Sequence, residues 1–157
     1  MRGKRGPLID PSGYDAGKKI KGKKRHILVD TLGLPVSVVV HPASIQDRDG
    51  GLLVLKVVRR LFPFIEKIFA DGGYQGLIAA AAVEALGPWR LEIVKRSDQA
   101  IGFQILPKRW IVERTFAWLG RCRRLAKDYE NRTRFALAYI HLAMIRLMLR
   151  RLAQSNP

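Results

Sequence analysis

The chain has 157 residues, 48% of them hydrophobic and 27% charged, a balance that is typical of a globular protein and excludes a disordered or fibrous one. Its 29 Lys and Arg residues against 13 Asp and Glu residues give a formal net charge of +16, which favours a polyanionic partner. The single cysteine, Cys122, excludes an internal disulfide and a Cys-rich zinc site, and it fits a reducing compartment.

The basic residues gather in two segments of the chain. Residues 1–25 hold nine basic and two acidic side chains, and residues 108–134 hold nine and three, whereas the stretch between them is neutral. A neutral centre between two basic segments is the expected electrostatic footprint of a nucleic-acid-binding protein. A solvated basic surface and a general RNA or ribosome binder are the alternatives.

Two features argue against a membrane protein. The N-terminus MRGKRGPLID lacks the apolar core of a secretory signal, and the apolar run at 135–145 stops at Arg146, short of the roughly 20 residues that a membrane span needs. We therefore expect a cytoplasmic protein without a membrane partner.

The first half of the chain predicts a leader, a hairpin and a helix. Residues 1–22 are rich in Gly and basic side chains, which predicts a flexible leader. Two β-rich stretches, at 24–30 and 35–41, flank the short link TLGL and predict a hairpin. A helix is expected over 50–62, capped by Asp47 or Asp49.

The second half alternates between strand and helix patterns before it becomes helical. The expected elements, in chain order, are a strand at 65–70 that ends before Asp71, a helix at 77–86, a strand at 90–96, a helix at 107–129 and a helix at 133–152. This order predicts the α/β class, with a mixed sheet and helices packed on it.

The helix expected from residue 107 carries two faces. One is an apolar stripe of Ile111, Thr115, Trp118, Cys122, Leu125 and Tyr129. At about 100° per residue, a different face gathers Arg109, Glu113, Gly120, Arg124 and Lys127.

Asp71 and Glu113 are the two carboxylates that invite a chemical interpretation. Asp71 follows an apolar strand and precedes two glycines, so a phosphate backbone could approach it without meeting a Cβ. Carboxylates at a strand end and on a helix suit Mg²⁺, which binds hard oxygen ligands in enzymes that cleave polynucleotides. The competing interpretations are a turn-forming Asp71 and a Glu113 that is only ion-paired to Arg109 at i−4.

Longer motifs carry a family resemblance. The segments GYDAGKKIKGKKRHILVDTLGLPVSVVVHPASIQDRDG, ADGGYQG and RWIVERTFAWLGRCRRLAKDYE together resemble bacterial insertion-sequence transposases of the DDE class, in order from about Gly13 to Arg151. The resemblance implies an RNase H-like fold, a mixed five-stranded sheet flanked by helices. It also implies DNA cleavage and strand transfer at transposon ends with Mg²⁺ or Mn²⁺.

The resemblance also assigns roles to residues. Asp71 in ADGGY matches the second catalytic Asp, Glu113 in VERTFAWL the catalytic Glu, and Arg109 the Arg of the signature around that Glu. Two positions depart from the signature: Leu106 stands where the family has Tyr, and Gly120 where it has Lys, so that Arg121 or Arg124 would supply the missing cation.

The front of the chain departs further. The family's first catalytic Asp lies on a strand upstream of GYDAGKK, where this chain offers only GPLIDPSG. Asp10 is the candidate for that residue, although the proline that follows it suits a central strand poorly. The alternative, which we favour, is that the sequence lacks the first catalytic Asp. We therefore expect a catalytic domain over 23–152 with an incomplete first strand, and a tail at 153–157. A DNA-binding remnant without catalysis is the alternative function.

The implied partner is double-stranded DNA at transposon ends and target, next to the bacterial nucleoid, and the resemblance allows a homo-oligomer. The residues expected to contact the DNA backbone are Lys18, Lys19, Lys21, Lys23, Lys24, Arg25, Arg121, Arg124 and Lys127.

Overall fold

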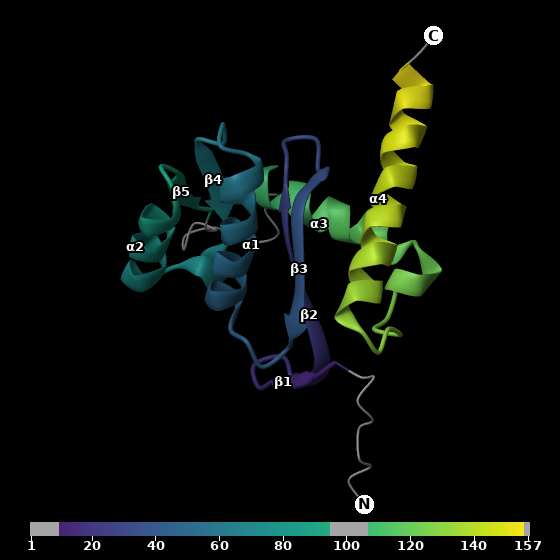
Figure 1. Ribbon diagram of the computed structural model, residues 1–157, viewed down its shortest axis with the longest axis horizontal. Helices are drawn as coiled ribbons and strands as arrows, with labels where there is room; N and C mark the ends of the chain where they lie inside the picture. The colour runs from purple at the N-terminus through teal and green to yellow at the C-terminus, as the bar shows by residue number, and fades with distance from the viewer. Residues whose placement is uncertain (1–9, 95–106, 156–157) are drawn as a thin grey trace, which may run out of the picture. The chain divides into compact units, whose positions relative to one another are not determined.

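The computed structural model describes residues 10–94 and 107–155, and the side chains of residues 77–80, 107 and 155 are outside that description (Figure 1). The start of the predicted leader, Leu106 and the last two residues of the tail therefore lie outside the described residues. The chain divides into two compact units. The first comprises Met1–Arg25, Val40–Ile45 and Phe116–Pro157, and the second comprises His26–Val39 and Gln46–Thr115.

Three strands form an N-terminal sheet with the order β1-β2-β3. Strand β1 (Gly13–Asp15) pairs antiparallel with β2 (Ile20–Val29), and β3 (Pro35–Pro42) lies on the other side of β2. Strand β1 and the start of β2 fall within the segment predicted as a flexible leader. Gly13 permits a close approach of β1 to the segment that follows β3, because a Cβ there would overlap the backbone of Ser44.

The predicted hairpin between β2 and β3 is confirmed. Asp30 organises its turn, since the carboxylate Oδ1 accepts hydrogen bonds from the backbone N–H of Leu32 at 2.9 Å and of Leu34 at 2.8 Å. Gly33 adopts a φ of 82°, a left-handed conformation that suits glycine. The fully buried Thr115 hydroxyl donates to the Gly33 carbonyl at 2.7 Å and so anchors the turn.

The second unit contains a strand–helix–strand arrangement. Its elements, in chain order, are α1 (Asp47–Leu61), β4 (Lys67–Ala70), the 3-10 turn η1 (Gly72–Tyr74), α2 (Leu77–Leu86) and β5 (Arg90–Ile93). Strands β4 and β5 pair in parallel, with Ile68 opposite Leu91. Parallel neighbours need a crossover connection, which α2 provides here.

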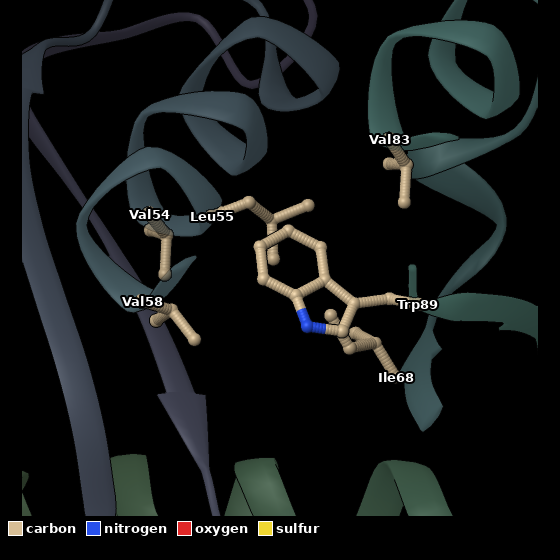
Figure 2. Close-up of a cluster of buried hydrophobic side chains, with 6 residues drawn as sticks. All are labelled: Val54, Leu55, Val58, Ile68, Val83 and Trp89. Atoms are coloured by element: carbon tan, nitrogen blue, oxygen red, sulfur yellow. The ribbon is translucent and has the colours of Figure 1, made fainter. Parts of the chain in front are cut away.

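A hydrophobic core joins these elements. Helix α1 packs against α2, and the Trp89 indole lies between Leu55 and Ile68 in Figure 2. The buried cluster consists of Val54, Leu55, Val58, Ile68, Val83 and Trp89. The core thereby fixes the end of β4, where Asp71 follows.

The start of α1 differs from the sequence prediction. Gln46 occupies the N-cap position without a side-chain capping hydrogen bond, so the prediction of a cap by Asp47 or Asp49 is wrong. Both carboxylates lie instead in the first turn, where negative charge interacts favourably with the helix dipole.

The single helix predicted over 107–129 is also wrong. Helix α3 (Pro107–Gly120) ends at a glycine, and the chain continues through the short 3-10 turn η2 (Arg123–Leu125) to α4 (Thr133–Ser155). Glycine favours helix ends, and Cys122 adopts an extended backbone with φ −83° and ψ 112°. Arg124 and Lys127 therefore do not share a helix face with Glu113.

The α/β class is confirmed: β1 and β2 pair antiparallel, and β4 and β5 pair in parallel. The RNase H-like arrangement stays a prediction. Helix α2 spans the residues predicted for it, and α4 begins at the predicted Thr133. In the part of the chain that the structure describes, no helix is long and apolar enough to cross a membrane.

Candidate functional site

Asp71 holds the turn that follows strand β4. Its backbone is extended, and its Oδ1 accepts a hydrogen bond from the Gly73 N–H at 3.0 Å while its carbonyl accepts one from the Tyr74 N–H at 3.1 Å. The interpretation of Asp71 as a turn former therefore describes its local role. The residue is nevertheless exposed, so its carboxylate is also presented to solvent.

A second carboxylate lies beside Asp71. A Cβ built on Gly73 would lie 3.1 Å from Asp71 Oδ1 and 3.9 Å from Asp47 Oδ2, so the two carboxylates flank the same point. Asp47 comes from the first turn of α1, which the core packs close to the end of β4. The sequence interpretation assigned Asp47 to helix capping and did not place it at this site.

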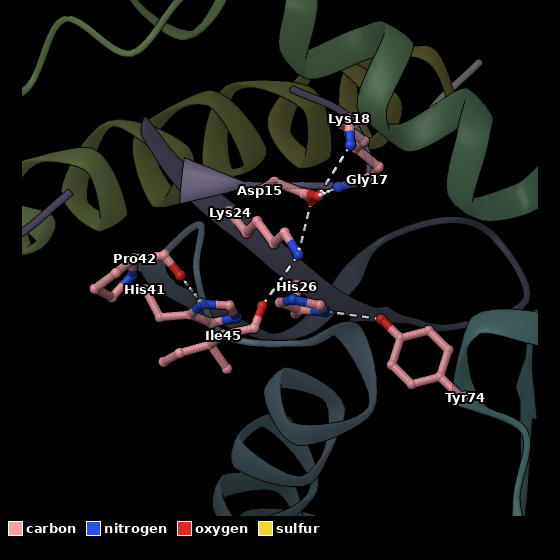
Figure 3. A network of polar contacts seen from close by, with 9 residues as sticks. All are labelled: Asp15, Gly17, Lys18, Lys24, His26, His41, Pro42, Ile45 and Tyr74. Atoms are coloured by element: carbon pink, nitrogen blue, oxygen red, sulfur yellow. Dashed lines mark hydrogen bonds and ion pairs between the residues drawn. The ribbon is translucent and has the colours of Figure 1, made fainter. Parts of the chain in front are cut away.

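Tyr74 anchors the turn that follows strand β4. Its hydroxyl and His26 Nδ1 are joined by a hydrogen bond of 2.7 Å, and the two rings meet edge to face (Figure 3). Burial first, and then the charges of Asp71 and Asp47, raise the pKa of the Tyr74 hydroxyl. Tyr74 thus stays a neutral hydrogen-bonding anchor three residues after Asp71, a position that was visible in the ADGGY motif.

Glu113 occupies the exposed side of α3. Its Oε1 accepts a hydrogen bond from Arg109 Nε at 2.7 Å, and both side chains are about half exposed, at 49% and 53%. An exposed pair at i and i+4 contributes about 0.3–0.5 kcal/mol. The guanidinium therefore orients the Glu113 carboxylate more than it stabilises the fold.

The hairpin between β1 and β2 presents three of the predicted DNA-contacting lysines. Asp15 Oδ1 accepts hydrogen bonds from the backbone N–H groups of Gly17 at 2.9 Å and Lys18 at 3.0 Å, which fixes the turn (Figure 3). Lys18, Lys19 and Lys21 are exposed on this turn and the adjoining strand, and we call them the hairpin lysines.

The next three cations of the same run have partners within the fold. Lys23 Nζ donates to the carbonyls of Glu130 at 2.6 Å and Asn131 at 3.1 Å, and Arg25 Nη1 donates to the Leu125 carbonyl at 2.8 Å. These contacts tie β2 to the connection between η2 and α4.

Lys24 also has partners within the fold. Its Nζ forms an ion pair with Asp15 Oδ2 at 2.9 Å and donates to the Ile45 carbonyl at 3.0 Å. Its side chain is only 16% exposed. The hydrogen bond from Lys24, followed by those from Lys18 and Gly17, lowers the pKa of Asp15.

A second basic surface surrounds η2. Arg124 forms an ion pair with Glu130 at 2.8 Å and lies over the Tyr139 ring, 5.2 Å from its centroid. Arg123, Arg124 and Tyr129 line an open hollow of about 400 Å³. Arg121 and Lys127, the other predicted DNA contacts in this segment, are exposed. Arg123 was missed by the sequence interpretation, although it stands in the same basic run.

Comparison with known proteins identifies the family. A family model described as the transposase DDE domain matches residues 3–148. The chain belongs to this family. It is 28% identical, over 158 residues, to a Burkholderia cepacia protein that is provisionally named as the transposase for insertion sequence element IS402. The match covers 90% of this chain and 66% of that relative, so the chain spans just under two thirds of the relative's length. No solved structure matches the chain.

Asp10, the alternative first carboxylate of this DDE domain, caps a helix. Its Oδ2 accepts a hydrogen bond from the backbone N–H of Thr133, the first residue of α4, at 2.5 Å, and its own N–H donates to the Asn131 carbonyl. The hydrogen bonds from Thr133 lower the pKa of Asp10. This arrangement gives Asp10 a structural role at the start of α4.

The acidic residues of the DDE domain do not assemble a complete metal site among residues 10–94 and 107–155. No group of three Asp, Glu, His or Cys side chains in these ranges could hold a metal ion. The pair of Asp47 and Asp71 offers hard oxygen ligands, but Mg²⁺ bound to two carboxylates needs further oxygens from substrate or water. The described residues therefore fit a metal only in part.

Proposed function

We propose that the chain is the catalytic domain, or part of it, of a DNA transposase with an RNase H-like fold. The match of the transposase DDE family over residues 3–148 carries this proposal. The proposed activity is hydrolysis of a DNA phosphodiester at an insertion-sequence end, followed by attack of the freed 3′-hydroxyl on target DNA. Such an activity belongs in the bacterial cytoplasm, next to the nucleoid.

The proposed DNA-binding surface uses the exposed cations. The hairpin lysines, together with Arg121, Arg124 and Lys127, are exposed and can neutralise phosphates without sequence readout. Lys23, Lys24 and Arg25 already donate hydrogen bonds to backbone carbonyls of the fold. In this proposal, these three residues shape the surface that the exposed lysines present.

Asp71 and Glu113 are the proposed catalytic carboxylates, with Arg109 as the residue that orients Glu113. Asp71 would be the acidic group nearest the scissile phosphate, because its turn contains no Cβ at the two following positions. Mg²⁺ or Mn²⁺ is the proposed cofactor and would supply Lewis-acid activation of the attacking oxygen.

A DNA-binding remnant without cleavage is the second candidate. Two observations favour it: Asp10 is engaged in capping α4, and the described residues gather no third metal ligand. The two candidates share the DNA-binding surface and differ only in chemistry, so one assay can separate them.

The deciding experiment is a cleavage assay on a labelled duplex from the insertion-sequence end, with Mg²⁺, Mn²⁺ or EDTA. A transposase nicks the end duplex with either metal, and Asp71→Asn and Glu113→Gln each lower the rate by roughly 10³-fold or more. Asp49→Asn, which removes an exposed acid from α1, is the matched control and should cleave normally.

Binding is measured in parallel by fluorescence anisotropy on the same duplex, on an unrelated duplex and on an RNA of equal length. Salt-sensitive DNA binding without nicking supports the remnant. Equal binding to all three polymers, together with no effect of Asp71→Asn, would contradict both candidates and indicate a general polyanion binder.

A further inference from the structure

Helix α4 carries an exposed apolar stripe in addition to its buried one. The exposed residues recur at alternating steps of three and four along the helix. They are Phe135, Ala138, Leu142, Ile145, Leu149 and Leu152. Five of these side chains are 46–64% exposed, and Ala138 is also exposed. We call these six residues the α4 seam.

The seam does not serve the core of its own unit. That role belongs to Ala136, Ile140 and Met144, which are at most 4% exposed and recur at steps of four on another side of the helix. Turn η2 packs against α4 within the same unit. A helix needs one apolar stripe to pack on its own domain. The second stripe is therefore available to pack against a different partner.

The spacing of the seam indicates what that partner is. Alternation of three and four gives an apolar repeat of 3.5 residues, which is the pattern of helices that pair in a coiled coil rather than the 3.6 repeat of a helix that lies on a globular core. A second copy of this chain carries the same repeat on its own helix α4. We propose that the α4 seam pairs with the α4 seam of a second copy, and that the two helices run antiparallel.

The helix dipole and the positions of the arginines favour one orientation. Helix α4 contains four arginines and no acidic residue, and three of the arginines, Arg146, Arg150 and Arg151, lie in its second half. A parallel pair would bring these three next to their counterparts and align the two helix dipoles. In an antiparallel pair the two dipoles oppose each other, and Arg150 and Arg151 lie far from their counterparts. Each Arg134 then lies near the basic end of the other helix, so this orientation reduces the repulsion between the helices without removing it.

Packing favours the same orientation. With Leu142 opposite Ile145 of the second copy, the antiparallel register also pairs Phe135 with Leu152 and Ala138 with Leu149. Each small residue then faces a large one. The parallel register would place Ala138 opposite itself and leave that layer poorly filled, at a cost in stability.

The size of the seam sets the expected affinity. Two half-exposed seams would remove on the order of 1,000 Å² from water, which is at the low end of specific protein interfaces. We therefore expect a reversible dimer whose population rises with protein concentration.

The association is tested by analytical ultracentrifugation of the nuclease-treated chain in high salt, over a hundredfold range of concentration, so that carried-over nucleic acid cannot bridge copies. The chain should show a concentration-dependent dimer, and Leu142→Glu should weaken the association at least tenfold while leaving the circular dichroism spectrum unchanged. The matched control is Leu61→Glu, because Leu61 is 57% exposed, close to the 60% of Leu142, and lies on α1. This control should dimerise like the parent chain.

Either of two results would overturn the proposal: a parent chain that stays monomeric throughout, or Leu142→Glu that dimerises as well as the parent. A monomer that binds vesicles of anionic lipid through Leu142 would assign the seam to a lipid surface instead, and would also overturn it.

The orientation has its own test. In a Cys122→Ser background, chains with Leu142→Cys and chains with Ile145→Cys are mixed and oxidised in air. The antiparallel register predicts mainly mixed disulfides between positions 142 and 145, whereas a parallel pair would give each variant a disulfide with itself. Predominance of the latter products would contradict the antiparallel arrangement.

Discussion

At the scale of single residues, acidic side chains in this basic chain serve first to order the backbone. Asp15 fixes the β1–β2 turn, Asp30 the β2–β3 turn, Asp71 the η1 turn and Asp10 the start of α4. Each carboxylate accepts at least one hydrogen bond from a backbone N–H of its own turn or helix start. A catalytic role for Asp71 would thus be added to a structural one, as its position at a strand end allows.

Asp10→Asn tests the capping role. The substitution removes the negative charge from the N-terminus of α4 and weakens the bond to the Thr133 N–H, so the urea midpoint should fall near neutral pH. Because the fold lowers the pKa of Asp10, its contribution is present above the unfolded pKa of about 3.9 and is lost as the pH falls through the folded value.

The difference between Asp10→Asn and the parent chain should therefore shrink as the pH is lowered below about 4. Asp128→Asn removes another exposed acid from the same unit and serves as the control. A midpoint difference that stays constant down to the lowest pH at which both chains fold would show that the Asp10 carboxylate does not cap α4.

Gly51 leaves space for the Tyr74 ring beside helix α1. A Cβ at this position would lie 2.5 Å from the Tyr74 ring, so Gly51→Ala must displace the side chain that anchors the Asp71 turn. The clash should cost about 1–3 kcal/mol, against a gain of roughly 1 kcal/mol in helix propensity.

We therefore expect Gly51→Ala to lower the unfolding free energy or leave it unchanged, and to disturb the His26–Tyr74 contact seen by NMR. At Gly120, a Cβ would meet nothing within 4 Å, so Gly120→Ala is the matched control. A stabilised Gly51→Ala with an intact His26–Tyr74 contact would show that the space beside Tyr74 is larger than the structure indicates.

At the scale of elements, the sequence patterns predicted correctly those helices and turns that depend on neighbouring residues in the chain. The helix over 77–86, the start of the last helix at Thr133 and the Gly33 hairpin follow from periodicity and turn chemistry within a few residues. The helix predicted over 107–129 failed because its apolar repeat continues past Gly120, although the backbone leaves the helix there. A periodic pattern does not by itself show where a helix ends.

The candidate site was predictable only in part for the same reason. Asp71 and Glu113 stand in recognisable motifs, but Asp47 reaches Asp71 only through the packing of α1 in the core. Lys23 finds its carbonyl partner 107 residues away, at Glu130. Such long-range contacts depend on the tertiary fold, so the basic run could not be divided beforehand into exposed and inward cations.

Because the hairpin lysines are exposed, their substitution should weaken DNA binding more than substitution of cations elsewhere on the surface. Replacing the three hairpin lysines together by glutamine should reduce the slope of log K against log salt by roughly 2–3, since each phosphate contact contributes about 0.9. Lys56→Gln, Arg59→Gln and Arg60→Gln combined remove the same charge from exposed positions on α1 and serve as the control. An equal loss of slope in both triple variants would indicate that net charge, and not the hairpin, determines binding.

At the scale of the whole molecule, the net charge of +16 affects stability as well as binding. With 29 cations and 13 anions, ion pairs can neutralise fewer than half of the basic side chains, and the rest repel one another. The described ion pairs include exposed ones such as Lys67–Glu92 and Arg109–Glu113, whose individual contributions are small. Repulsion should therefore outweigh attraction in the free protein.

Added salt should then raise the stability of the free chain and weaken its binding to DNA. Raising NaCl screens the repulsion, so the free chain should gain about 1 kcal/mol, or roughly 2–4 °C in Tm. DNA stabilises the folded chain by mass action at low salt, and this added stability should disappear at high salt as binding weakens. Scanning calorimetry with and without a duplex across a salt series measures both trends. A Tm of the free chain that falls with salt would mean that the ion pairs dominate. In that case, repulsion among the excess cations would not limit the stability of the free chain, and the expected gain in stability with salt would be contradicted.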